Sequence, residues 1–117
     1  MSRYVPRAGD LIWLDFDPQT GREQAGRRPA LVLSPSSYNA KSSLAVVCPV
    51  TSHGKGYPFE VALPGSGKIS GAILADHLRS VDWERRHADF ASKVSREVLH
   101  AVQERIALLL GLPTPTA

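Results

Sequence analysis

A short polar segment between two apolar stretches carries the side chains best suited to act together on an anionic substrate. It contains Arg22, Glu23, Gln24, Arg27 and Arg28, together with two glycines and no bulky apolar residue. Guanidinium groups bind phosphate oxygens strongly, and a carboxylate beside them can accept a proton. These residue types are the ones needed to grip a phosphodiester and to move a proton next to it.

Phosphate chemistry without a bound metal suits RNA, because RNA carries its own nucleophile in the 2′-hydroxyl group. Catalysis then needs a base for that hydroxyl, a cation for the charge that develops at phosphorus, and a proton for the leaving oxygen. Glu23 and Arg28 can supply the first two, and Thr51 can add a hydroxyl donor. A plainer interpretation stays open, in which Glu23 and Arg28 form a surface ion pair and Thr51 belongs to a turn.

Aromatic side chains interleaved with cations suit the splayed bases of single-stranded nucleic acid. Core packing is the alternative, and it is equally good for Trp13 and Phe16. The aromatic residues in question are Trp13, Phe16, Tyr57 and Trp83, and the neighbouring cations include Lys55, Arg79, Arg85 and Arg86.

The sequence has 117 residues, of which 43% are hydrophobic and 21% charged, as in ordinary globular proteins. This length predicts one domain, which we place at residues 1–112, followed by a short tail at 113–117. Lys and Arg number 14 against 11 Asp and Glu, so the formal net charge is +3. This mild basicity fits a polyanionic partner but does not require one.

Several other classes of site find no support in the sequence. No glycine-rich dinucleotide or P-loop motif is present, and the lone Cys48 permits no disulfide within the chain. The histidines lack metal-ligand spacing, so each is more typical of a surface residue than of a metal ligand. We therefore expect no cofactor, no metal and no membrane span, and a cytoplasmic protein. The four histidines are His53, His77, His87 and His100.

Apolar patterning predicts five strands, followed by one helix. The first two strands flank the polar segment, and Pro49 predicts that the third ends near it or lies at an edge. The fourth is expected to pair with the third, the fifth to be long or bulged, and residues 83–90 to form an irregular connection. The predicted strands are Leu11–Phe16, Ala30–Leu33, Leu44–Val50, Phe59–Leu63 and Gly71–Val81.

Helical spacing of apolar residues begins only after Ser95, which is a suitable N-cap. The periodic positions run from Val98 to Leu110, and Gly111 followed by Pro113 predicts a clean stop. A serine in the segment 34–37 is expected to cap a short helical turn through Lys41. Short strands with one terminal helix predict an α+β fold, mostly β, built as a small antiparallel barrel or sandwich.

Four segments together resemble the MazF/PemK family of toxin endoribonucleases, and its MazF branch in particular. They run from Ser2 to Trp83 in the order that the family has, and the first two make a long and specific pattern. The segments read SRYVPRAGDLIWLDFDP, GREQAGRRPALVLSPSSYN, PVTSHGKGYPFEVAL and LADHLRSVDW.

The resemblance implies a homodimer of small SH3-like barrels that cuts single-stranded RNA at a short sequence motif, with a cognate MazE-like antitoxin that silences it. Members cleave without metal by attack of the 2′-hydroxyl, leaving a 2′,3′-cyclic phosphate and a 5′-hydroxyl. By position, Arg28 matches the family's essential arginine, Thr51 the threonine that ends the third strand, and Glu23 the acidic residue of EQAG.

These matches lead to predicted roles. Arg28 is expected to stabilise the phosphorane charge, because guanidinium does not give up its proton near neutral pH. Thr51 would fix a phosphate oxygen, and Glu23 would be the base. A second group of residues is predicted to bind RNA. It comprises Trp13, Gln24, Arg27, Lys55, Tyr57, Arg79 and Arg86.

Two other functions are possible on the same barrel fold. One is a toxin that targets DNA gyrase, but such relatives end in Trp-Gly-Ile, whereas this sequence ends in Pro-Thr-Ala. The other is a non-catalytic nucleic-acid binder, against which the joint presence of Glu23, Arg28 and Thr51 argues. Loss of growth arrest in Arg28→Ala would distinguish a nuclease from a binder.

Overall fold

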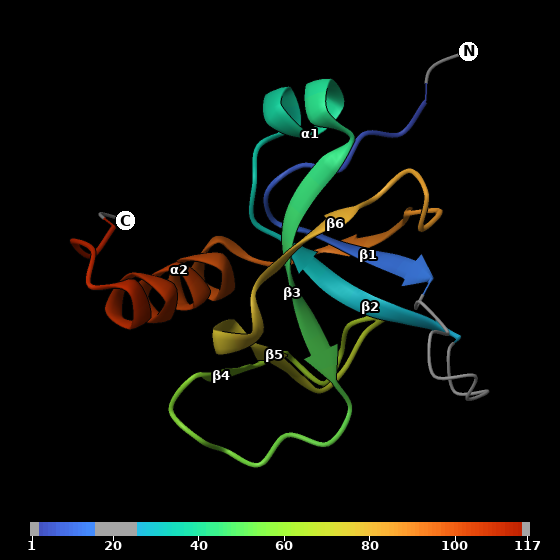
Figure 1. Cartoon of the computed structure of the whole chain (residues 1–117). Coiled ribbons are helices and arrows are strands. Elements are labelled where there is room, and N and C mark those ends of the chain that lie inside the picture. Colours follow the sequence, from blue (N-terminus) through green and yellow to red (C-terminus); the bar gives the residue numbers. More distant parts are fainter. Residues whose placement is uncertain (1–2, 16–25, 116–117) are drawn as a thin grey trace.

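The computed structural model describes residues 3–15 and 26–115, and within them the chain is mostly β (Figure 1). Seven strands, two helices and one 3-10 turn follow one another in these residues. In chain order they are β1 (Asp10–Asp15), β2 (Arg27–Val32), α1 (Ser36–Ser42), β3 (Leu44–Thr51), β4 (Glu60–Ala62), β5 (Ala72–Leu74), η1 (Ala75–His77), β6 (Arg79–Asp82), β7 (Asp89–Lys93) and α2 (Arg96–Leu110).

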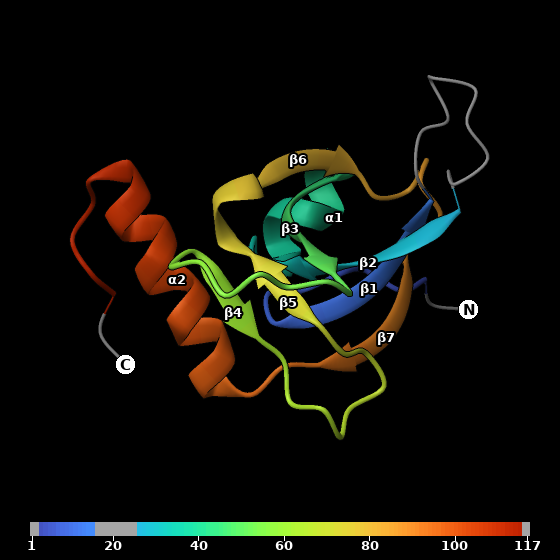
Figure 2. The ribbon, with the colours of Figure 1, turned by 90° about the horizontal axis from the view of Figure 1, so that it is seen from below.

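All pairings in the sheet are antiparallel, and β3 is its central strand. The neighbours run β4-β5-β3-β2-β1-β7, and β6 pairs with β3 beside β5. The sheet curls strongly around itself, as Figure 2 shows. This confirms the predicted small, mostly β, antiparallel fold. The barrel is open, since β4 and β7 are the two ends of the path among the described residues.

Both faces of the curled sheet are packed, because apolar residues fill consecutive positions of its strands. Leu11 and Leu31 point into one cluster, while Ile12 and Val32 point into a second cluster on the other face. The first cluster is covered by α2, whose Val102 is fully buried in it. A sheet covered on both faces forms a rigid frame for the side chains at the strand ends.

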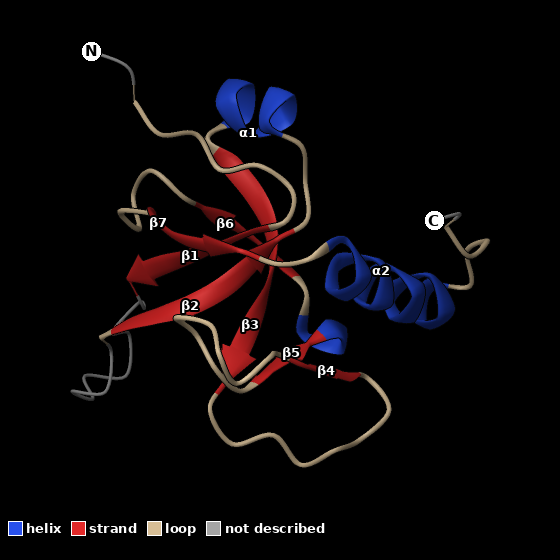
Figure 3. Ribbon diagram, turned by 180° about the vertical axis from the view of Figure 1, so that it is seen from behind, coloured by secondary structure: helices blue, strands red, loops and turns tan. Residues whose placement is uncertain are grey.

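The terminal helix α2, which leads to the C-terminus in Figure 3, has the bounds and both caps that the sequence predicts. The Ser95 hydroxyl accepts a hydrogen bond from the Val98 amide at 3.1 Å. Gly111 adopts a left-handed φ of 70° and its amide donates to the Ala107 and Leu108 carbonyls, which ends the helix. The shorter helix α1 is also present, but no serine side chain caps it, because Pro35 occupies the N-cap position.

The prediction of one strand over Gly71–Val81 is wrong. The 3-10 turn η1 divides this segment into β5 and β6, which pair with different parts of β3. Gly71 makes the entry into β5 possible: its φ is +115°, and a Cβ there would lie 2.0 Å from the Thr51 carbonyl oxygen. Apolar character alone does not distinguish one long strand from two short ones joined by a turn.

One strand-pairing prediction is also wrong. β4, within the predicted strand Phe59–Leu63, pairs with β5 and not with β3. Pro49 lies inside β3, opposite Ala30 of β2, and the strand ends two residues later at Thr51, near Pro49 as predicted. On its other side β3 pairs with β6 up to Val47 and with β5 from Val50, so the missing amide of Pro49 falls between two ladders.

Two strands begin at positions that the sequence did not predict. β7 begins at Asp89, inside the expected irregular connection, and pairs with β1. β2 begins at Arg27 and not at Ala30, so Arg27 and Arg28 lie on the strand, opposite Asp15 and Leu14. Arg28 is therefore held by the β1–β2 ladder and does not belong to the connecting loop.

Candidate active site

A pocket of about 180 Å³ opens where β2 begins and β1 ends, and it is bordered by three arginines. Arg28 comes from β2, Arg79 from β6 and Arg86 from the turn between β6 and β7. Three guanidinium groups around one small cavity make a site for an anion of phosphate size. The lining residues are Leu14, Asp15, Arg28, Pro29, Ala30, Val47, Pro49, His77, Arg79, Val81 and Arg86.

Arg28 and Thr51 lie on the same face of neighbouring strands. Ala30 and Pro49 are direct partners across β2 and β3, and both line the pocket. Because side chains alternate along a strand, Arg28 and Thr51, each two residues further on, point to this same side. The Thr51 hydroxyl oxygen accepts the His53 amide at 3.1 Å. A hydroxyl that accepts one bond still has its hydrogen to donate.

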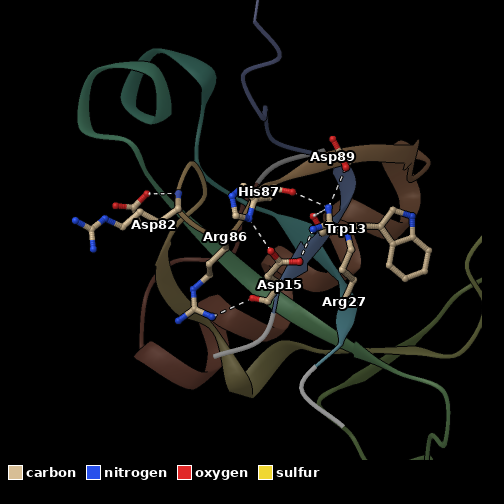
Figure 4. A network of polar contacts seen from close by, with 8 residues as sticks. Trp13, Asp15, Arg27, Asp82, Arg86, His87 and Asp89 are labelled. Atoms are coloured by element: carbon tan, nitrogen blue, oxygen red, sulfur yellow. Dashed lines mark hydrogen bonds and ion pairs between the residues drawn. The ribbon is translucent and has the colours of Figure 1, made fainter. Parts of the chain in front are cut away.

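The Arg27 guanidinium is bonded within the molecule (Figure 4). It donates to Asp15 at 2.5 Å and to Asp89 at 3.0 Å, and to the backbone carbonyls of Trp13 and His87. These bonds tie the end of β1 to the start of β7 beside the pocket. The role of Arg27 in RNA binding stays a prediction, and the structure adds that this side chain holds strands together.

Asp15 lies between Arg27 and His87 at the pocket's edge. His87 Nδ1 is 2.6 Å from one carboxylate oxygen, and Arg27 bonds the other. The hydrogen bond from His87, followed by that from Arg27, lowers the pKa of the Asp15 carboxyl below its usual value. Asp15 thus remains ionised, and Arg27, which does not line the pocket, is one cation that balances its charge.

Arg86 is anchored to the end of β1. Its Nη1 donates to the Asp15 carbonyl oxygen at 3.2 Å, and its own carbonyl accepts the Asp15 amide at 2.8 Å. The turn before it is closed by the Asp82 carboxylate, which accepts the Arg85 amide at 3.0 Å (Figure 4). Arg86 is therefore a preorganised member of the pocket and not a swinging surface arginine.

Lys55 and Tyr57 lie on the connection between β3 and β4, outside the pocket lining. Glu60 orders this connection, because its carboxylate accepts the Lys55 and Gly56 amides. The Tyr57 hydroxyl donates to Asp76 at 2.7 Å, and this bond, more than desolvation, raises the pKa of Tyr57 to about 12. Tyr57 is thus a neutral phenol attached to η1, next to the pocket.

The predicted aromatic residues occupy different environments. Trp13 is 36% exposed and, by strand alternation, faces the opposite side of the sheet from the pocket residue Leu14. Trp83 is a core residue whose indole nitrogen donates to the Asn39 carbonyl at 3.0 Å, so its suggested role in stacking on bases is wrong. Phe16, Glu23 and Gln24 lie outside the described residues.

Sequence reasoning missed His77, which lines the pocket together with the three arginines. It is the last residue of η1, and its Nε2 lies 3.8 Å from an Asp76 carboxylate oxygen. The spacing of His77 from the other histidines does not match that of metal ligands, so it gave no indication of a functional role. Its position two residues before Arg79, in a segment already assigned to RNA binding, was the available clue.

Two further observations bear on the kind of protein. Among residues 3–15 and 26–115, no cluster of three or more His, Cys, Asp or Glu side chains is arranged to hold a metal ion. In the same residues no helix combines the length and apolar character needed to cross a membrane.

With this geometry in place, comparison with known proteins is decisive. A family model described as "PemK-like, MazF-like toxin of type II toxin-antitoxin system" matches residues 7–110. The chain belongs to this family. The toxin is 49% identical over 111 residues to the endoribonuclease toxin MazF of Escherichia coli strain K12, covering 95% of this chain and 99% of that protein. It is 34% identical over 117 residues to the endoribonuclease PemK of Escherichia coli, covering 92% and 88% of the two chains.

Solved structures give the same assignment for the fold. A MazE–MazF crystal structure from Deinococcus radiodurans (Form-III) matches the toxin with a TM-score of 0.88 at 52% identity, over 94% of this chain and 100% of that one. The resemblance seen in the sequence is thus confirmed. The family match covers every residue that lines the pocket, from Leu14 to Arg86.

Proposed function

We propose that this toxin is an endoribonuclease that cleaves single-stranded mRNA at a short sequence motif, without a metal ion. The pocket formed by Arg28, Arg79 and Arg86 is the observation that carries the proposal, because it offers a preorganised cationic site for one phosphate. The near full-length similarity to the endoribonuclease toxin MazF of Escherichia coli supports it.

The RNA supplies the nucleophile. Its 2′-hydroxyl attacks the adjacent phosphorus, the bond to the 5′-oxygen breaks, and the products are a 2′,3′-cyclic phosphate and a 5′-hydroxyl. Arg28 stabilises the negative charge that develops on the phosphorane, and Thr51 fixes a phosphate oxygen by donating a hydrogen bond to it. Glu23 removes the proton of the 2′-hydroxyl. The segment 16–25, which carries Glu23, joins two strands that line the pocket.

The flanking nucleotides are bound by the residues around the pocket. Arg79 and Arg86 contact phosphates and set the position of the strand, whereas Gln24 and Tyr57 contact bases. Lys55 adds a phosphate contact. Trp13 lies on the other side of the sheet from the pocket, so its exposed ring would stack on a base only where the RNA extends beyond the pocket. Arg27 contributes by holding Asp15 and Asp89 in place as well as by its charge.

Two protein partners belong to the proposal. A cognate MazE-like antitoxin inhibits the toxin, and a MazE–MazF crystal structure among its matches supports this pairing. An acidic, flexible antitoxin segment would occupy the same arginine pocket as the RNA. The toxin is also proposed to be a homodimer, and to act in the cytoplasm, where its substrate is.

The test is to incubate the purified toxin with a long single-stranded RNA in EDTA and to map the ends of the fragments. Discrete cuts at one motif with cyclic-phosphate and 5′-hydroxyl ends are expected, with a loss of at least about 10²-fold in Arg28→Ala. Arg96→Ala, on the first turn of α2, is the matched control and should cleave normally.

Absence of cleavage by the folded, antitoxin-free protein would contradict the proposal that it is a nuclease. Binding of the RNA without cleavage would then favour a non-catalytic binder. Inhibition of DNA gyrase would favour the gyrase-targeting alternative. Cleavage that depends on added Mg²⁺ would contradict the metal-independent chemistry alone.

A further inference from the structure

The connection between β3 and β4, residues 52–59, carries Lys55 and Tyr57, two of the residues proposed to bind RNA. It is the wide loop at the bottom of Figure 1. A loop that has to be ordered when RNA binds loses part of its affinity to that ordering, whereas a loop that is already ordered does not. The contacts that fix this backbone before RNA arrives therefore bear directly on the strength of binding.

The Glu60 carboxylate, at the start of β4, organises the first half of this connection. One oxygen accepts the Gly56 amide at 2.8 Å and the Lys55 amide at 3.0 Å, and the other oxygen accepts the Lys55 amide at 3.0 Å. Two successive amides aimed at one carboxylate form an anion-binding concavity, and the charge of the acceptor strengthens both bonds. The backbone also passes close to this carboxylate at Gly54, where a Cβ would lie 3.0 Å from Glu60 Oε1.

The second half of the connection has anchors of its own. The Tyr57 hydroxyl donates to Asp76 of η1 at 2.7 Å, and the Pro58 carbonyl accepts the Arg105 Nε–H of α2 at 3.0 Å. These two bonds hold residues 57 and 58 without any help from the Glu60 carboxylate. Loss of that carboxylate should therefore release the part of the backbone that carries Lys55 and leave Tyr57 attached to η1.

Glu60 is unfavourable beside RNA if only its charge is considered, because RNA is a polyanion. Its oxygens, however, bond backbone amides and do not neutralise the nearest lysine. Lys55 is exposed, and the ion pairs among the described residues do not include it. The Lys55 ammonium thus extends from a fixed backbone and is available to a phosphate.

We propose that Glu60 is a positioning residue for RNA binding, whose carboxylate fixes the backbone of Lys55 so that the ammonium meets a phosphate of the bound strand. This inference rests on the proposed function, in which Lys55 contacts a phosphate. The proposal fixes the sign of an effect. If Glu60 positions Lys55, neutralising Glu60 weakens RNA binding. If Glu60 is only a surface charge, neutralising it strengthens the binding of a polyanion.

The test measures binding apart from cleavage. The probe is a short single-stranded RNA that contains the mapped motif and has a 2′-deoxy sugar at the cut position, so that the nucleophile is missing. We expect Glu60→Gln to bind this probe about tenfold more weakly than wild type, because its amide group keeps one accepting oxygen and loses the charge. The slope of log Kd against log salt concentration should fall by about 0.7, the share of one phosphate contact on a single strand.

Two further variants and one measurement on wild type make the test specific. In the Lys55→Ala background, Glu60→Gln should weaken binding by less than about twofold, because the two residues act through one contact. Glu97→Gln removes an exposed carboxylate on the first turn of α2 and should bind at least as tightly as wild type. Hydrogen exchange of the wild-type Lys55 and Gly56 amides, which needs no variant, should be slow.

The possible outcomes separate the two proposals. If Glu60→Gln binds the probe as tightly as wild type or more tightly, the positioning role is wrong, while the nuclease proposal stands. The same conclusion follows if the loss is equally large in the Lys55→Ala background, or if the two amides exchange as fast as in an unfolded chain. If wild type neither binds the probe nor cuts the all-ribose RNA, the proposed function is wrong, and the role of Glu60 is wrong with it.

Discussion

Asp15 shows how one exposed carboxylate organises the edge of the pocket. It joins Arg27 and His87, and through Arg27 it is linked to Asp89 on the neighbouring strand (Figure 4). Exposed ion pairs contribute little singly, but a shared carboxylate that connects three chain segments restrains all of them. The network thus fixes the backbone carbonyl of Asp15, to which Arg86 bonds.

The pKa of Asp15 gives this network a pH signature. The folded-state value is lowered from the usual one, so ionised Asp15 stabilises the fold above the unfolded pKa, and this contribution is lost as pH falls through the lower, folded pKa. We expect Asp15→Asn to lower the urea midpoint at pH 7. The difference from wild type should shrink steadily below about pH 4.

Urea unfolding of both proteins between pH 7 and pH 3 measures this effect. Asp89→Asn, which removes only one of the partners of Arg27, is the matched control and should have the smaller effect at pH 7. A difference between Asp15→Asn and wild type that stays constant down to pH 3 would falsify the assignment of the effect to this carboxylate.

The residues of the site were predictable to different degrees. Arg28, Thr51 and Glu23 were selected from their chemistry and from the motif around them, because phosphate binding and proton transfer require those types. The place of His77 in the pocket lining was signalled only by its closeness in sequence to Arg79, because the pocket is assembled from separate chain segments. The sequence also could not indicate that the Arg27 guanidinium donates hydrogen bonds to the carboxylates of Asp15 and Asp89.

At the scale of elements, β3 determines where the site lies. It pairs with β2 along one edge, and with β6 and then β5 along the other. Because β3 pairs with β2 on one edge and with β6 on the other, Arg79 of β6 and the end of β3 lie near Arg28 of β2. The turn η1 joins the strands of the two ladders, β5 and β6, and so places His77 at the pocket.

Gly71 is expected to be the least replaceable glycine among those that the structure describes. A Cβ at this position would lie 2.0 Å from the Thr51 carbonyl oxygen, and its φ of +115° is unfavourable for other residues. We predict that Gly71→Ala lowers the free energy of unfolding by at least about 2 kcal/mol and also reduces RNA cleavage, because it displaces the backbone of Thr51.

Chemical denaturation and a cleavage assay test this prediction together. Gly67→Ala is the control, since a Cβ there meets only ordinary contacts at 3.7 Å, and it should change stability by less than about 0.5 kcal/mol. Full stability of Gly71→Ala would mean that β5 can shift away from β3 without cost.

Local signals predicted the elements better than their pairing. α2 could be predicted with both caps, because Ser95 and Gly111 act on the residues next to them. The division of Gly71–Val81 and the partner of β4 depend on strands distant in sequence, and the apolar pattern of each strand is compatible with several partners. The start of β2 was missed because its first two residues are exposed arginines.

At the scale of the whole molecule, the two ends of the fold have different surfaces. The arginine pocket lies where β1 ends and β2 begins. The helix α2 lies beside β4, away from these strand ends (Figure 2). The end of α2 exposes four leucines, namely Leu108, Leu109, Leu110 and Leu112. Contiguous exposed apolar side chains on a small protein are typical of an association surface.

This leucine surface is where we expect the homodimer to form. An apolar cavity of about 460 Å³ adjoins it, bordered by Ile106, Leu112 and Pro113 among others, and a symmetric partner could fill the cavity while covering its own leucines. Leu108 is 74% exposed and Leu110 55%, so charged replacements there should leave the fold of one chain intact. We predict that Leu108→Glu/Leu110→Glu is monomeric where wild type is dimeric.

Light scattering coupled to size-exclusion chromatography, over a hundredfold range of concentration, measures this difference. Glu97→Lys, at the opposite end of the same helix, alters charge without touching the leucine surface and should remain dimeric. A dimer that survives the double glutamate substitution would place the interface on a sheet face. If the wild type is monomeric at every concentration tested, the proposal that the toxin is a homodimer is wrong. A monomer that still cuts RNA would show that dimerisation is not needed to complete the arginine pocket.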